Sequence, residues 1–383
     1  MLPVVIVGGL HADARRATVD ALLRLVPRSV ALHHDLTGAA ESTVRRVLRD
    51  GGGPVDSGEA PLVNDCACCA LREDLLPELE RLADSGVLCA LAVVELWDSV
   101  EPQAIARLLG AADQERLSLV GVVTAIDPAL VRPCLANTDD LADVGLAAAP
   151  SDHRTVGDTF ARQLEYAPVL ALVAGEAEPD ATDRALLAQL HPLARLTGPA
   201  DPAFPRVVTA GFDAVAAAAR VHPATALLPQ DGTGHGVTTR VWRARRPFHP
   251  DRLYAALPEL ACAALRSRGR FWLADRFDAM LSWEAVGGAL CVDRIGPWLA
   301  SLPEAAWSEV PPERRAAALV DWDPHQGDRG QHLVFVSPDL DAEGLGALLD
   351  SCLLTDAEHE LGPMVWACRG SGFDQLLEPL PQS

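Results

Sequence analysis

The sequence contains no lysine, and all 32 of its basic residues are arginine. The usual phosphate-binding loop needs a lysine to bridge the phosphates, so no loop of that standard form is present. The 53 acidic residues bring the formal net charge to -21. Because contacts to nucleic-acid phosphates need a surplus of positive charge, direct sequence-specific binding to nucleic acid is not expected.

Long apolar runs are also missing. No stretch approaches the ~20 residues that a membrane helix needs, so no membrane partner is expected. The apolar start from Leu2 to Leu10 is short and has no basic region before it, unlike a secretory leader. The nine cysteines are an odd number. Their clustering is typical of reduced thiols in a cytoplasm, which is where we expect the protein to act.

The first half of the chain alternates short apolar strands with helices. Strands are predicted at 3–9, 30–33, 87–96, 119–125 and 169–174, and helices at 13–26, 42–48, 71–82 and 158–166. This alternation predicts an α/β fold in residues 1–221, with a mostly parallel sheet covered by helices on both faces.

A change of composition divides the chain. Residues 222–236 are rich in proline and glycine and are predicted to be a linker. The pattern beyond it predicts a smaller α+β domain at 237–383, with a first strand at 237–245, a helix at 249–267, a meander of three short strands, a last strand at 333–337 and a helix at 340–352.

Three cysteines form a CxCC cluster just before a predicted helix: Cys66, Cys68 and Cys69. Three thiols this close can converge on one ion, and Zn²⁺ prefers thiolate ligands in a tetrahedral shell. The alternative is a group of small, partly buried or oxidisable side chains without a metal. The spacing favours a metal but does not by itself fix which one.

A fourth ligand would have to come from elsewhere in the chain. His34 and Asp35 lie at the end of the second predicted strand, and the ends of parallel strands are where sites gather. Imidazole and carboxylate both suit zinc, so either residue is a candidate. The alternative is that both are solvent-facing polar residues at a strand end.

These residues resemble the CobW family of metal-handling GTPases. The segment from Cys66 to Leu76 is similar to the CxCC segment of that family, although Asp65 stands where the family has glycine. Further similar segments follow in the family's order: Arg245 to Leu253, Arg266 to Ala274, Gly287-Gly288 and Gly327 to Phe335. The resemblance implies a P-loop-NTPase-like first domain, a CobW C-terminal domain and a role in zinc handling.

The phosphate-binding loop that the resemblance implies is eroded. Gly9 holds its first glycine position, but Ala14 replaces the second glycine and Arg15 replaces the lysine. Arg16 stands in place of the hydroxyl that would hold Mg²⁺. Only Gly9 and Arg15 are therefore kept as residual nucleotide-binding positions.

The other nucleotide motifs of the family depart in the same way. In its Glu-x-Thr-Gly segment Glu95 remains, but Trp97 and Asp98 replace Thr and Gly. The guanine-reading Asn-Lys-x-Asp is absent from Val173 to Glu176. Since the groups that neutralise charge in phosphoryl transfer are missing, neither GTP with Mg²⁺ nor any catalytic residue is expected.

The favoured interpretation is a pseudo-GTPase that binds Zn²⁺ and acts as a metallochaperone or zinc-responsive factor, with a client metalloprotein as partner. The resemblance extends to nucleotide-deficient actinobacterial members that recruit a hibernation factor to ribosomes in zinc starvation, and Arg243 to Arg246 would then be a candidate docking strip. A residual GTP-binding protein is the second alternative. Nothing in the sequence indicates an oligomeric state.

Overall fold

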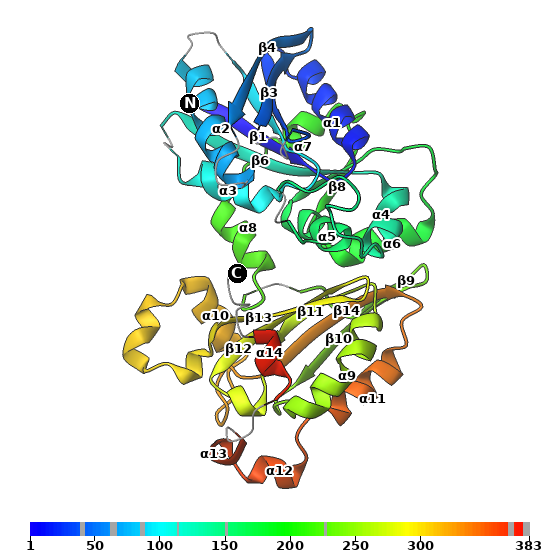
Figure 1. The fold of residues 1–383 in the computed structure, drawn as a ribbon, viewed down its shortest axis with the longest axis vertical. Helices are drawn as coiled ribbons and strands as arrows, with labels where there is room; N and C mark the ends of the chain where they lie inside the picture. The colour runs from blue at the N-terminus through cyan, green and yellow to red at the C-terminus, as the bar shows by residue number, and fades with distance from the viewer. Residues whose placement is uncertain are drawn as a thin grey trace. The chain divides into compact units, whose positions relative to one another are not determined.

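The computed structural model describes residues 1–38, 43–61, 67–84, 89–112, 115–149, 152–225, 228–366 and 371–377, with the backbone alone at 60–61, 67–70 and 72. The chain divides into two compact units, Met1–Ala218 and Ala219–Ser383 (Figure 1). Each unit has its own sheet and its own hydrophobic core.

The first unit contains an eight-stranded sheet in the order β4-β3-β2-β5-β1-β6-β7-β8. Its strands are β1 (Leu2–Gly8), β2 (Ser29–Asp35), β3 (Thr43–Asp50), β4 (Gly53–Pro61), β5 (Leu91–Glu95), β6 (Leu117–Ile126), β7 (Val169–Leu172) and β8 (Arg195–Thr197). The neighbouring strands β2, β5, β1, β6, β7 and β8 all pair in parallel. Strand β3 pairs antiparallel with both β2 and β4. The predicted α/β class with a mostly parallel sheet is confirmed.

Helices cover both faces of this sheet, as expected from strands that are apolar throughout. Val5 and Val7 of β1 pack against α1 (Ala12–Leu25) and α7 (Phe204–Val208) on one face. On the other face lie α2 (Ala67–Asp84) and α3 (Pro102–Gly110), with Gly8 closely approached by Pro102. The remaining helices are α4 (Val131–Leu135), α5 (Val156–Tyr166), α6 (Ala181–Leu190) and α8 (Ala214–Val221).

The helix predicted at 42–48 is wrong, because the described residues there belong to strand β3. Val44, Val47 and Leu48 have helical spacing, but Val44 and Leu48 are also an even number of residues apart and therefore lie on the same face of a strand, with Val47 on the other face. Burial of Val44 and Leu48 at 1% and 4% exposure stabilises the hairpin. Short apolar patterns of this kind do not separate helix from strand.

The second unit contains an antiparallel sheet in the order β13-β12-β11-β14-β10-β9. The strands are β9 (Gly232–Gly234), β10 (Val237–Ala244), β11 (Arg266–Phe271), β12 (Ala279–Val286), β13 (Ala289–Pro297) and β14 (Gln331–Pro338). Thus part of the segment predicted as a linker forms the edge strand β9. The other described α-helices are α9 (Pro250–Cys262), α10 (Pro312–Val320), α11 (Ala342–Ser351), α12 (Asp356–Glu360), α13 (Pro363–Trp366) and α14 (Phe373–Leu377).

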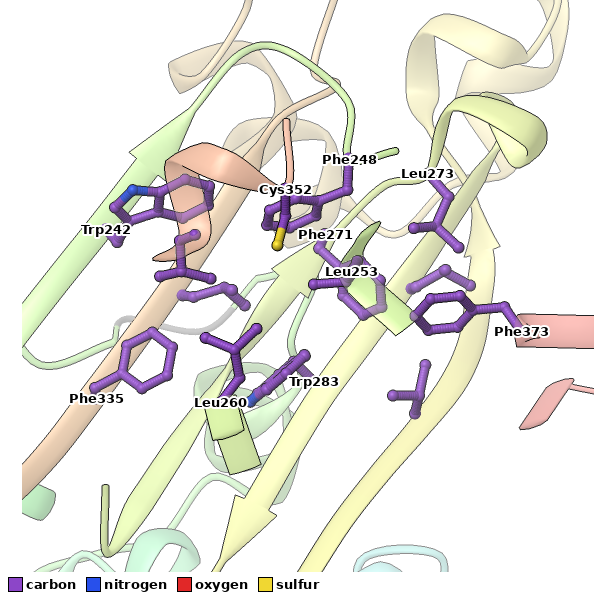
Figure 2. Packing of buried hydrophobic residues seen from close by; sticks show 14 of the residues in the cluster. Trp242, Phe248, Leu253, Leu260, Phe271, Leu273, Trp283, Phe335, Cys352 and Phe373 are labelled. Carbon is purple, nitrogen blue, oxygen red and sulfur yellow. The ribbon is translucent and has the colours of Figure 1, made fainter. Parts of the chain in front are cut away.

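An aromatic core lies between one face of this sheet and helices α9 and α11 (Figure 2). Phe271 and Trp283 meet edge to face, and Trp242 stacks on Phe248. The indole of Trp283 donates to Ser267 over 2.9 Å, so its buried N–H is satisfied. These tryptophans and phenylalanines are packing residues of the α+β unit.

Polar residues of the segment Gly327 to Phe335 hold loops of the second unit together. The Gln331 side chain accepts a hydrogen bond from the backbone N–H of Trp272 and donates to the carbonyls of Trp272 and Arg246. Asp328 accepts from the backbone N–H groups of Leu299 and Ala300, each over 2.9 Å. The motif therefore stabilises the fold of the unit.

In the described residues there is no helix with both the length and the apolar character to cross a membrane. None of the cysteines whose side chains the structure describes forms a disulfide; these are Cys89, Cys134, Cys262, Cys291 and Cys352.

Candidate functional site

The loop between β1 and α1 occupies the position of a phosphate-binding loop. Gly9 follows β1 directly and has a φ of 132°, a conformation that side chains rarely allow. A Cβ placed there would lie 2.3 Å from the carbonyl oxygen of Ala125 in β6. Glycine is thus required at this position by the backbone packing itself, whether or not a phosphate ever binds.

Replacing Gly9 with alanine is expected to destabilise the first unit, by about 3 kcal/mol from backbone strain plus the clash with Ala125. Gly53 provides a matched control, because its φ is 126° but no atom lies within 4 Å of a Cβ built there. Urea unfolding should therefore show a clearly larger loss for Gly9→Ala than for Gly53→Ala. Equal losses would contradict the close approach to β6.

Arg15 points back into this loop from the first half of α1. It is 3% exposed, its Nη1 donates to the carbonyl oxygen of Gly9 over 2.6 Å, and its Nη2 pairs with the carboxylate of Asp98. The Asp98 side chain is 14% exposed, so this is a largely buried ion pair. The positive charge at the lysine position is therefore neutralised by the protein itself.

His11 connects the same loop to the end of β6 and to helix α4. Its Nδ1 accepts a hydrogen bond from the backbone N–H of Asp127 over 2.9 Å, and its Nε2 lies 3.3 Å from the sulfur of Cys134. Burial is the main reason that the pKa of His11 falls to about 4, so the ring is neutral at physiological pH. Burial likewise raises the pKa of the Cys134 thiol to about 11.

Three further residues lie at or near positions where the family's nucleotide motifs would act. The Thr18 hydroxyl is fully buried and donates to the carbonyl of Ala14 within α1. Asp13 is exposed in the first turn of that helix, where its charge opposes a triphosphate. Glu176, in the segment that replaces the guanine-reading motif, is also exposed.

His34 lies at the end of β2 and reaches helix α2. Its Nε2 is 2.7 Å from Oδ2 of Asp74, and the His34 side chain is 3% exposed. Arg46 of β3 donates to the other oxygen of Asp74 over 2.9 Å. The hydrogen bond from His34 is the largest reason that the pKa of the Asp74 carboxyl is lowered, so Asp74 remains an anion that fixes the imidazole ring.

The cysteine cluster is next to this contact in the chain. Cys66 lies outside the described residues, and for Cys68 and Cys69 only the backbone is described, in the first turn of α2. Because Asp74 lies on α2, its contact with His34 brings the end of β2 next to the helix whose first turn contains Cys68 and Cys69. Within the described side chains, no group of three or more His, Cys, Asp or Glu could hold a metal ion.

The side chain of Asp35, the other candidate ligand, accepts hydrogen bonds within the turn that follows β2. Its Oδ1 accepts from the backbone N–H of Thr37 over 2.9 Å and from the Thr37 hydroxyl. Burial would raise the pKa of Asp35, but these hydrogen bonds outweigh it and lower the pKa. The neighbouring His33 turns to the carbonyl of Glu95 and stacks on Trp97.

Sequence reasoning missed two partners in this region, Asp74 and Asp98. The pairing of Asp98 with Arg15 could have been inferred from the sequence. An acidic residue replaces a family glycine at position 98 and an arginine replaces the family lysine at position 15, so the two departures have opposite charges. Asp74 carried no such signal, since an acidic residue on an amphipathic helix is most often solvated.

Comparisons with known proteins found a matching family and several relatives. The sequence profile of the cobalamin synthesis protein cobW C-terminal domain matches residues 237–353. A protein of Mycobacterium tuberculosis (strain ATCC 25618 / H37Rv) named zinc chaperone Rv0106 is 30% identical, over 95% of this chain and 90% of that protein. Zinc-regulated GTPase metalloprotein activator 1 of Dictyostelium discoideum is 28% identical, over 79% of this chain and 67% of that protein. Among solved structures, the Zn(II)-bound YjiA GTPase from E. coli is 15% identical with a TM-score of 0.36, over 92% of this chain and 99% of that chain.

Proposed function

Because the chain belongs to the CobW family, we propose that it binds Zn²⁺ and acts in zinc homeostasis without a competent GTPase site. Two relatives that cover most of the chain are named as a zinc chaperone and as a zinc-regulated metalloprotein activator. These names support zinc as the cargo and a client metalloprotein as the partner. The described cysteines, none of which is in a disulfide, support a cytoplasmic location.

The ligands in this proposal are Cys66, Cys68 and Cys69, with His34 as the fourth. The observation that carries it is the 2.7 Å contact between His34 and Asp74. A metal-bound histidine commonly offers its second ring nitrogen to a carboxylate, which orients the ring and raises its basicity. Bonded to Asp74 through Nε2, His34 has Nδ1 left for the metal.

Asp35 is the alternative fourth ligand. It lies one position further along β2, and its carboxylate already holds the turn to Thr37. In either case the metal is cargo: the protein's own residues bind it, keep the thiols close together and release it to a client. Three thiolates with one exchangeable fourth position suit transfer better than a closed structural site does.

Replacing His34 with glutamine is expected to weaken zinc binding by at least about tenfold, as for the loss of a residue that orients or ligates the metal. Asp35→Asn and His33→Gln are matched controls on the same strand and should leave the affinity nearly unchanged. Competition against a chromophoric zinc chelator measures all three. A loss in Asp35→Asn alone would assign the fourth position to Asp35 and contradict the assignment to His34.

We further propose that GTP and Mg²⁺ are not ligands of this protein. The charge at Arg15 is neutralised by Asp98, the Thr18 hydroxyl is engaged within α1, and His11 closes the loop onto Asp127. A triphosphate would have to displace these contacts without gaining a lysine or a Mg²⁺ hydroxyl in return.

The interaction function, recruitment of a hibernation factor to ribosomes, depends on the strip from Arg243 to Arg246. Arg243 and Arg245 are exposed, but Arg246 already pairs with Asp356 over 2.6 Å and donates to the carbonyl of Leu354. Sedimentation with small ribosomal subunits in the presence of a zinc chelator separates the two functions. Binding that Arg243→Glu abolishes would favour the ribosome, and transfer of zinc to an apo-metalloenzyme would favour the chaperone.

A further inference from the structure

Three basic side chains stand in a row across the sheet of the second unit. Arg270 of β11 is paired with His332 of β14, and His332 is paired with Arg243 of β10. Residues directly opposite one another on neighbouring strands point to the same face. The adjoining pair, Trp242 and Leu333, belongs to the aromatic core (Figure 2), so the row lies on the face away from that core.

A cavity opens over this row. It has a volume of about 180 Å³. A cavity of ~150 Å³ is enough for a molecule the size of benzene, so this one can hold a small organic anion or a phosphate. Besides the row, the charged side chains that line it are Arg245, Asp321 and Asp328.

The cavity has more positive than negative charge available to a ligand. Arg270 is 8% exposed and pairs with Asp321, while its Nη1 donates to the carbonyl of Pro223 over 3.2 Å. Asp328 is occupied by the backbone N–H groups of Leu299 and Ala300. Neither carboxylate forms an ion pair with the two arginines at the rim. The pKa of Asp323 is lowered by backbone hydrogen bonds and, to a lesser extent, by the charge of Arg245.

Those rim arginines, Arg243 and Arg245, are exposed and have no carboxylate within 4.0 Å in the described part of the chain. The Nη2 of Arg243 lies 3.3 Å from Nε2 of His332, and Nη1 of Arg245 is 3.4 Å from the carbonyl of Arg329. Both contacts leave several N–H donors of each guanidinium unused, since a guanidinium has five.

The electrostatics of the row agree with a shortage of negative charge. Burial, followed by the charges of Arg270 and Arg243, lowers the pKa of His332 to about 3, although Asp321 acts in the opposite direction. His332 is then neutral, and its Nε2 accepts from Arg243. Arg243 and Arg270 lie two strands apart with the neutral ring of His332 between them, so an anion placed over this ring is attracted by both guanidinium groups.

We propose that this cavity is a binding site for a small oxyanion, the carboxylate or phosphate group of a small molecule, held by Arg243 and Arg245 with Arg270 and His332 at its floor. One guanidinium group can bind two oxygens of a carboxylate or phosphate at once, so the two rim arginines, Arg243 and Arg245, suit such a ligand. The site is independent of the cysteine cluster and of the proposed zinc function. A carboxylate and a phosphate are distinguished by the choice of probe.

Calorimetry on the full chain with succinate and with inorganic phosphate, at low ionic strength, tests the site. One anion per chain is expected, with the tighter probe identifying the ligand class. Arg243→Gln and Arg245→Gln should each weaken binding by about tenfold, because each removes charge-assisted hydrogen bonds. Both side chains are exposed, so these variants keep the fold.

Arg240→Gln is the matched control, since Arg240 is an exposed arginine on the same strand that is not part of the cavity lining. It should bind the probes as the unchanged chain does. A second readout is the ring of His332: at pH 5 its proton resonances should shift toward the charged form when the probe is added, because an anion between Arg243 and Arg270 raises its pKa.

The proposal would be overturned by no binding of either probe, by binding that survives both rim substitutions, or by an equal loss in Arg240→Gln. Binding of a glutamate-rich peptide without binding of either small probe would also overturn it, since the surface would then recognise an acidic protein segment rather than a small molecule.

Discussion

A chain in which serine replaces Cys68 is expected to lose its tightly bound zinc. A serine hydroxyl is not ionised at neutral pH and is a poor ligand for Zn²⁺, whereas a thiolate is one of the ligands that zinc prefers. The loss of affinity should exceed the ~100-fold that marks the removal of an outer-shell partner. Metal analysis after dialysis and competition with a chelator both measure it.

Cys262→Ser provides the matched control for this substitution. Cys262 is exposed and free in the second unit and plays no part in the proposed site. It should keep the zinc stoichiometry of the unchanged protein, which shows that loss of a thiol alone is not sufficient. Unchanged stoichiometry in Cys68→Ser would rule out the cluster as the zinc site.

Replacing Arg15 with alanine is expected to destabilise the first unit by about 3 kcal/mol, because it leaves the charge of Asp98 largely buried without a partner. GTP affinity should not change, since the native loop is expected to have none to lose. Urea unfolding measures the first effect and calorimetry with GTP and Mg²⁺ the second.

The double variant Arg15→Met with Asp98→Leu separates charge from packing. Well-packed apolar residues of similar volume often replace a buried ion pair with little loss, so this chain should recover most of the stability that Arg15→Ala loses. If Arg15→Ala alone left the stability unchanged, the ion pair of Arg15 and Asp98 would have to be exposed to solvent rather than buried. A large drop in GTP affinity in Arg15→Ala would mean that Arg15 replaces the lysine in function.

The parts of the fold that could be predicted are those in which a residue pattern is compatible with only one type of secondary structure. The apolar runs of β1, β5 and β6 are buried on both faces, so their composition alone indicates a parallel sheet. The spacing of Val44, Val47 and Leu48, in contrast, is compatible with a helix and with a strand. The pairing of β3 with β4, which the sequence does not show, selected the strand.

Local patterns in the sequence predict the residues of the candidate site but not their contacts. The spacing of the cysteines and the position of His34 at a strand end are local patterns. The partners of His34 and Arg15 lie 40 and 83 positions further along the chain, and the partner of Arg243 lies 89 positions away. Which polar side chains meet over such separations depends on strand register and helix orientation, so only the folded chain shows them.

The central claim is that zinc binds at the cysteine cluster and that nucleotide plays no part. The most direct test is the metal content and zinc affinity of the reduced protein, measured with and without GTP and Mg²⁺, together with calorimetry of GTP alone. The account predicts one zinc per chain, an affinity that GTP does not alter and no heat from GTP. A chain that binds GTP with measurable heat but holds no zinc would contradict it.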